Sequence, residues 1–126
     1  MSRRKKPAGS PKRKMSEMIS EMAAPFISEG KTPAEKHHRL TAACSAWNMA
    51  CGSPEIRRQQ LDQYVEGYQR FNPTTSPSDL ANILKDMESL IERKLKMFPE
   101  DQRQIISASV IIVGNDYRIE VASATL

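Results

Sequence analysis

Aromatic residues, glycine and long apolar stretches are all scarce in this chain of 126 residues. Aromatic side chains make up 6% of the sequence, and the five glycines are scattered, so no glycine-rich loop is present to bind phosphate groups. No apolar stretch approaches the roughly 20 residues that a membrane-spanning helix requires. The length suits one domain whose core needs neither disulfides nor a metal. The sequence therefore predicts a small single domain outside the membrane.

A signal for export is also lacking. The segment 15–26 follows a basic start, but serine and glutamate residues at four positions interrupt it. It therefore lacks the continuous apolar region of a signal peptide. This predicts a cytoplasmic protein, or a nuclear one if the source is eukaryotic, with its thiols kept reduced.

Positive charge is concentrated at the N-terminus. The chain has 19 Lys and Arg residues against 15 Asp and Glu, a formal charge of +4. Seven of the cations lie within residues 1–14, which contain no acid, so the remainder has 12 cations against 15 acids and a net charge of about −3. Residues 1–14 also contain two prolines and a glycine without apolar periodicity, and we expect a disordered basic arm there. Residues 15–126 then form the single folded domain.

Three helix starts can be predicted from the sequence. Thr32-Pro33, Ser53-Pro54 and Ser76-Pro77 each place a hydroxyl at the N-cap and a proline in the first turn. Apolar residues at helical spacing follow each start, which predicts helices over about 33–50, 54–70 and 77–97. A shorter helix is expected from Met15, with Pro25 ending or kinking it. Its methionines and Trp47 are interpreted as core residues.

The pattern changes to that of strands near the C-terminus. Residues 104–126 are rich in β-branched residues and are divided by the turn signal Gly114-Asn115-Asp116. A two-residue loop at Asn115-Asp116 pairs Ile112 with Ile119 and places alternate residues on an apolar and a mixed face. The predicted fold is α+β, with four helices followed by a C-terminal antiparallel β-hairpin.

Catalytic and metal-binding patterns are weak. His37, Cys44 and Cys51 recur every seven residues of a predicted helix, but that spacing corresponds to a rise of about 10 Å, too long for two of them to share one ion or for the cysteines to form a disulfide. His37 and His38 point in different directions on the helix. No local signature of a nucleophile surrounds either cysteine. We therefore expect no catalytic residues, metal or cofactor, and no small-molecule substrate is indicated.

The basic arm is a candidate site for polyanions. Flexible Lys and Arg residues bind phosphate backbones without reading sequence. The candidate residues are Arg3, Arg4, Lys5, Lys6, Lys12, Arg13 and Lys14. A solubilising arm without a dedicated partner is the alternative.

The hairpin is a candidate site for contact with another chain. Its apolar face, including Ile106 and Val110, is expected to pack on the helices, which leaves Ile105, Ile111 and Val113 on the mixed face. Neither charge nor proline protects the edge from Ile105 to Val113, and such edges pair with other strands. Coverage by the third or fourth helix is the competing arrangement.

These patterns predict a non-catalytic interaction or accessory module that self-associates through the hairpin, as a homodimer, or binds another protein chain. The alternative is a nucleic-acid-associated protein that uses its basic arm. An enzyme subunit whose chemistry comes from a partner chain is a more distant option.

Overall fold

The computed structural model describes residues 13–124. Four helices come first: α1 (Met15–Ser28), α2 (Pro33–Ala50), α3 (Pro54–Phe71) and α4 (Pro77–Met97). Two antiparallel strands follow, β1 (Gln104–Val113) and β2 (Asp116–Ala124). The predicted α+β fold of four helices and a C-terminal hairpin is confirmed. Within the described residues, no helix is both long and apolar enough to cross a membrane.

The three predicted helix starts are confirmed. The hydroxyl oxygens of Thr32, Ser53 and Ser76 accept hydrogen bonds from main-chain N–H groups three residues later, at 3.1, 3.3 and 3.1 Å. Each N-cap is in an extended conformation and a proline follows it in the first turn. These bonds satisfy donors that the helix itself leaves unpaired, which explains why the starts could be read from sequence.

Helix α1 continues beyond Pro25 to Ser28, so of the two effects predicted for this proline, ending or kinking the helix, the first was wrong. Proline has no N–H, and the carbonyl of Glu21, one turn earlier, loses its usual intrahelical donor. Arg93 of α4 supplies donors instead: Nη2 donates to the Glu21 oxygen at 3.1 Å and Nε to the Met22 oxygen at 2.6 Å. A side chain distant in sequence thus satisfies the carbonyls beside the proline.

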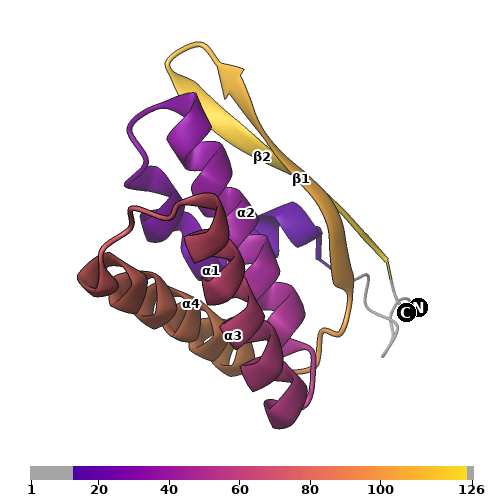
Figure 1. Ribbon diagram of the computed structural model, residues 1–126. Coiled ribbons are helices and arrows are strands. Elements are labelled where there is room, and N and C mark those ends of the chain that lie inside the picture. The colour runs from indigo at the N-terminus through magenta and orange to yellow at the C-terminus, as the bar shows by residue number, and fades with distance from the viewer. Residues whose placement is uncertain (1–12, 125–126) are drawn as a thin grey trace.

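The elements form three layers, with α1 and α2 between the hairpin and the pair α3 and α4 (Figure 1). Strand β1 lies against α2 and β2 against α1, while α4 packs on the opposite side of α2. The buried apolar residues form one cluster, in which Trp47 is fully buried. Met15, Met18 and Met22 of α1 are also buried, which confirms the interpretation of these methionines as core residues.

The hairpin register differs from the prediction by two residues. The loop is Gly114-Asn115, and Val110 pairs with Ile119 rather than with Val121. Gly114 has φ of 62°, a conformation that glycine adopts without strain and that two-residue hairpin loops require. A shift of two residues preserves side-chain parity, so the two faces from Ser107 to Val113 are as expected.

The register is irregular at the start of β1. Ile105 pairs with Ser123 and Ser107 with Ala122, so Ile106 is an extra residue in a β-bulge. Beyond this point the faces exchange: Ile105 is 9% exposed and belongs to the core, while Ile106 is 68% exposed. The expectation that Ile106 packs on the helices and Ile105 lies on the mixed face was therefore wrong.

Candidate interaction surface

Polar contacts fasten the start of β1 to α2. The Asn48 side chain donates from Nδ2 to the Ile105 oxygen at 3.0 Å, and the Ile105 N–H donates to Oδ1 at 2.7 Å. The amide therefore binds both main-chain groups of Ile105, as a neighbouring strand would. At Ile105, the Asn48 side chain therefore occupies the edge of β1 where another strand would pair.

A buried cluster holds the connection between α4 and β1. Trp47 Nε1 donates to the Arg103 oxygen at 2.8 Å, and the Nζ atom of Lys94 donates to the Asp101 oxygen at 2.7 Å. Lys94 is fully buried, and its Nζ lies 5.1 Å from the centroid of the Trp47 ring, within the range of a cation–π contact. The Arg103 guanidinium pairs with the Asp101 carboxylate. Together these contacts fix where β1 begins.

The other end of the hairpin rests on the last residue of α1 and the first turn of α2. The hydroxyls of Tyr117 and Ser28 are 3.0 Å apart, and Lys36 Nζ lies 5.3 Å from the centroid of the Tyr117 ring. Between the two ends, the partly buried side chains Ala108, Val110, Ile119 and Val121 pack against the core. Helices α1 and α2 thus cover the inner face of the hairpin except near its turn, where Ile112 is exposed.

The outer face of the hairpin divides by strand. On β1 it carries Ile106 in the bulge, Ile111 and Val113, with small serines between them. The parity of β2 places three charged side chains on this face, Asp116, Arg118 and Glu120. Arg118 and Glu120 form an exposed ion pair at 3.0 Å. One strand therefore offers an uncharged column and the other a charged one.

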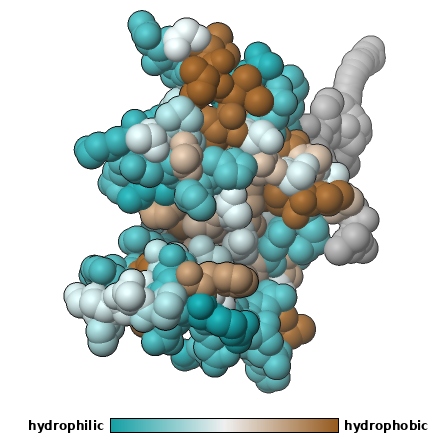
Figure 2. All heavy atoms as spheres, turned by 45° about the horizontal axis from the view of Figure 1, so that its top comes forward, coloured by the Kyte–Doolittle hydropathy of each residue, from teal (hydrophilic) through white to brown (hydrophobic). Residues whose placement is uncertain are grey.

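Neither α3 nor α4 contacts the hairpin, which excludes coverage of the outer face by these helices among the described residues. Ile106 is 68% and Val113 52% exposed, and Ile111 is half-buried. On the face seen in Figure 2, hydrophobic side chains gather toward the top, the end of the molecule that carries the hairpin turn, and hydrophilic side chains surround them. An apolar column beside an open strand edge is suited to contact with another chain.

The structure separates the predicted interface residues. Ile111 and Val113 lie on the outer face, as predicted, whereas Ile105 lies in the core. Ile106 takes its place on the outer face because the bulge adds one residue to the strand. Sequence parity alone cannot reveal a bulge, although the polar pair Asn48–Ile105 marks where it begins.

The predicted polyanion-binding residues lie largely outside the described part of the chain: Arg3, Arg4, Lys5, Lys6 and Lys12. Of the remaining two, Lys14 is the N-cap of α1, and Arg13 forms ion pairs with Glu17 and Glu21. The Arg13 oxygen also accepts a hydrogen bond from Arg103. These two residues belong to the folded domain rather than to a free arm, and the acidic partners of Arg13 compete with any phosphate.

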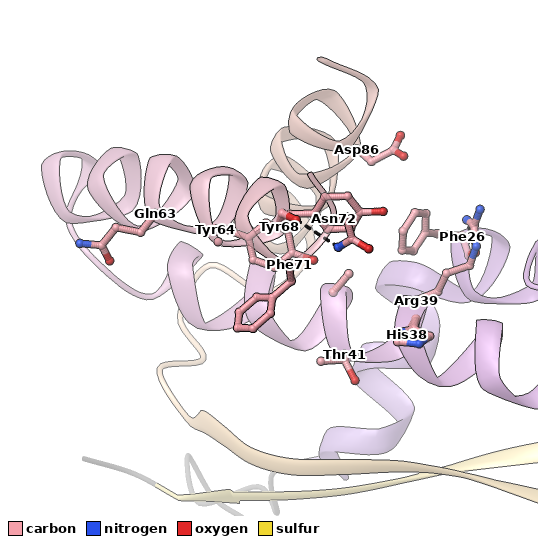
Figure 3. Close-up of a pocket in the computed structure, with 12 residues that line it drawn as sticks. Phe26, His38, Arg39, Thr41, Gln63, Tyr64, Tyr68, Phe71, Asn72 and Asp86 are labelled. Atoms are coloured by element: carbon pink, nitrogen blue, oxygen red, sulfur yellow. Dashed lines mark hydrogen bonds between the residues drawn. The ribbon is translucent and has the colours of Figure 1, made fainter. Parts of the chain in front are cut away.

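A separate groove of about 690 Å³ lies between α2 and α3. Figure 3 shows Phe26 and Arg39 on one side of it and the α3 side chains Tyr64, Tyr68 and Phe71 on the other. Phe71 is 83% exposed, and burial raises the pKa of Tyr64. In the described part of the chain, the His38 side chain at its rim makes no hydrogen bond or ion pair, so the groove contains no histidine hydrogen-bonded to a nucleophile or to an orienting carboxylate.

The two cysteines are separated and protected. Burial raises the pKa of the Cys44 thiol to about 12, so it is protonated at neutral pH and a poor nucleophile. Cys51 is partly buried and its pKa is also raised, by burial first, against the lowering effect of Lys94. Both thiols are free, and residues 13–124 contain no cluster of His, Cys, Asp and Glu arranged to hold a metal.

No protein-family model, curated protein sequence or solved structure matches the chain.

Proposed function

We propose that the protein is a non-catalytic interaction module that self-associates through the outer side of its C-terminal hairpin. The observation that carries this proposal is the apolar column of β1, formed by Ile106, Ile111 and Val113, which no other element among residues 13–124 covers and which lies beside a strand edge that no strand in this range pairs with. A two-stranded sheet is marginally stable by itself, and helices already support its inner face. A strand from a second chain would pair with the main-chain N–H and C=O groups at the free edge of β1.

Replacing Ile111 by lysine is expected to weaken this association. Each subunit would bring an unpaired ammonium group into an apolar contact, and we expect the dissociation constant to rise at least about tenfold. Size-exclusion chromatography with light scattering, over a dilution series, measures the change. Circular dichroism establishes that the variant is folded.

Ile56→Lys provides a matched control, because Ile56 is an isoleucine of α3 that is 48% exposed and away from the hairpin. The control adds the same charge and should leave the association unchanged. Equal dissociation constants for the wild type and Ile111→Lys would contradict the proposed surface.

The second candidate function is binding of nucleic acid through the basic arm. It is favoured by the five cations within residues 1–12, whereas residues 13–124 have 14 cations against 15 acids and are nearly neutral. Deletion of residues 1–12 should abolish retention on polynucleotide and preserve the ion pairs of Arg13. For the full chain, the logarithm of the association constant for polynucleotide should fall linearly with the logarithm of the salt concentration. The slope should be no steeper than about −4.5, because five cations can make at most five phosphate contacts.

The control for the deletion keeps its length and replaces the five cations by glutamine. Loss of binding in this variant as well would assign the effect to charge. Undiminished binding by the truncated protein would contradict the arm hypothesis and indicate a basic patch on the folded domain.

A further inference from the structure

We infer that the partner of the hairpin is a second copy of this chain, with β1 pairing antiparallel to β1 of that copy about a two-fold axis at Val110. The inference rests on the proposed function and adds the strand, its direction and its register. The product is a four-stranded sheet in which the two β1 strands are central and the two β2 strands are at the edges.

The free edges of the two strands differ in charge. From Ser107 to Val113, β1 has neither a charged residue nor a proline. On β2, Asp116, Arg118 and Glu120 alternate along the outer face, and the Asp116 carboxylate already accepts the Tyr117 N–H at 2.7 Å. Pairing through β2 would desolvate these charges, while pairing through β1 leaves them at the rim. The edge of β1 is therefore the one open to a second strand.

In an antiparallel pair, every second residue of β1 hydrogen-bonds to β2, and the residues between them have main-chain groups free to pair with another strand. In a hairpin closed by a two-residue loop, the closing pair, here Val113 and Asp116, exchanges hydrogen bonds, and the pattern alternates from there. Ala108, Val110 and Ile112 then direct their N–H and C=O groups to the free edge. The Tyr117 and Ile105 N–H groups fit this pattern, since each bonds to a side chain instead of to the opposite strand.

Side-chain size fixes the register. In the regular part of β1 beyond the bulge, the residues before Val110 are small and those after it are large: Ser107, Ala108, Ser109, then Ile111, Ile112, Val113. A two-fold axis at Val110 places Ser109 opposite the partner's Ile111 on the outer face. On the inner face it places Ala108 opposite the partner's Ile112. At the axis Val110 meets the partner's Val110, and on either side of it each large side chain meets a small one, which allows the two strands to pack without gaps or clashes.

This pairing also accounts for the exposed Ile112. Its parity places it on the inner face, yet it is 50% exposed near the end of the hairpin. In the four-stranded sheet it gains a neighbour across the new strand boundary. The bulge at Ile106 and the Asn48 side chain at Ile105 end the paired segment on the other side.

A pair of proline variants tests which edge is used. Val110 and Ile119 are cross-strand partners, both partly buried on the inner face, and both have N–H groups directed away from the β1–β2 ladder. Proline is tolerated at such edge positions. Val110→Pro should raise the dissociation constant at least about tenfold by removing hydrogen bonds at the two-fold axis, whereas Ile119→Pro should change it less than about threefold.

Several outcomes overturn the inference while leaving the proposed function intact. If Val110→Pro remains dimeric and Ile111→Lys does not, the outer faces stack instead of the edges pairing. If only Ile119→Pro dissociates, the β2 edges pair. A wild-type monomer would instead contradict the proposed function itself.

Disulfide trapping gives a second measurement that does not depend on the proline variants folding. Ser109→Cys protein is mixed with Ile111→Cys protein, both in a Cys51→Ser background. The inferred register brings these two positions opposite each other at a distance that a disulfide spans. We expect linked dimers in the mixture and few in either protein alone. Equal linkage in all three samples would overturn the register.

Discussion

Replacing Trp47 by alanine is expected to lower the free energy of unfolding by about 3–5 kcal/mol, the largest effect of any single change that we predict. Trp47 is fully buried, and its ring lies 5.8 Å from that of Phe98, measured between centroids. The substitution leaves a large cavity, removes the aromatic face under Lys94 and leaves the Arg103 oxygen without its indole donor. Chemical denaturation measures the loss.

Trp47→Phe separates packing from hydrogen bonding. It retains an aromatic ring, and we expect it to lower the free energy of unfolding by about 1–3 kcal/mol, mainly because the Arg103 oxygen keeps only the weak Cys51 thiol donor, at 3.8 Å. If Trp47→Ala lowered the free energy of unfolding less than Trp47→Phe does, the result would contradict the role of this ring as the anchor between α2 and the start of β1. The hairpin depends on this anchor for its position, so the result bears on the proposed interface.

Replacing Arg93 by alanine is expected to lower the free energy of unfolding by about 2 kcal/mol. The guanidinium donates to the Glu21 and Met22 oxygens, beside the proline that leaves the Glu21 oxygen without an intrahelical partner. Charge-assisted hydrogen bonds of this kind contribute about 1.5–3 kcal/mol, and part of that is lost to solvent exposure of the side chain. Thermal and denaturant unfolding both report the change.

A double-mutant cycle with Pro25→Ala tests the physical reason. Alanine restores an N–H that can donate to the Glu21 oxygen, so Arg93→Ala should cost less in that background by about 1 kcal/mol. Equal costs in the two backgrounds would contradict the idea that Arg93 compensates for the proline. Lys85→Ala, at an exposed position of the same helix, controls for loss of a cation from α4.

Local signals explain how much of the fold could be predicted. The N-caps at Thr32, Ser53 and Ser76 act on donors within three residues, so the sequence around each start contains all the information needed. The continuation of α1 through Pro25 could not be predicted in this way, because it involves Arg93, far away in sequence. The loop register depended on one detail, the positive φ of Gly114.

The candidate site was predictable to the same extent. Side-chain parity correctly placed Ile111 and Val113 on the outer face, since parity survives a two-residue shift of register. The bulge that exchanges Ile105 and Ile106 coincides with hydrogen bonds from Ile105 to the distant Asn48, and side-chain parity along β1 does not reveal it. One sequence feature could have indicated the buried cluster at the start of β1. Lys94 lies at helical spacing from Leu90 and Ile91, both of which are buried, and a lysine is unusual at such a position.

The apolar stripe of α3 is less buried than its periodicity predicts. Ile56 and Tyr68 belong to an apolar pattern of helical period, but on this helix only Leu61 is buried among the described residues. Periodicity predicts which face of a helix is apolar, and the depth of burial depends on how closely neighbouring helices approach. Here the open groove beside α2 leaves much of the stripe in contact with solvent.

Sedimentation equilibrium of the full chain, at several rotor speeds and over concentrations from below to above the micromolar range, tests self-association most directly. The open β1 edge and its apolar column predict a reversible equilibrium, with the average mass rising from that of one chain toward twice that value. A mass equal to one chain at every concentration would contradict it.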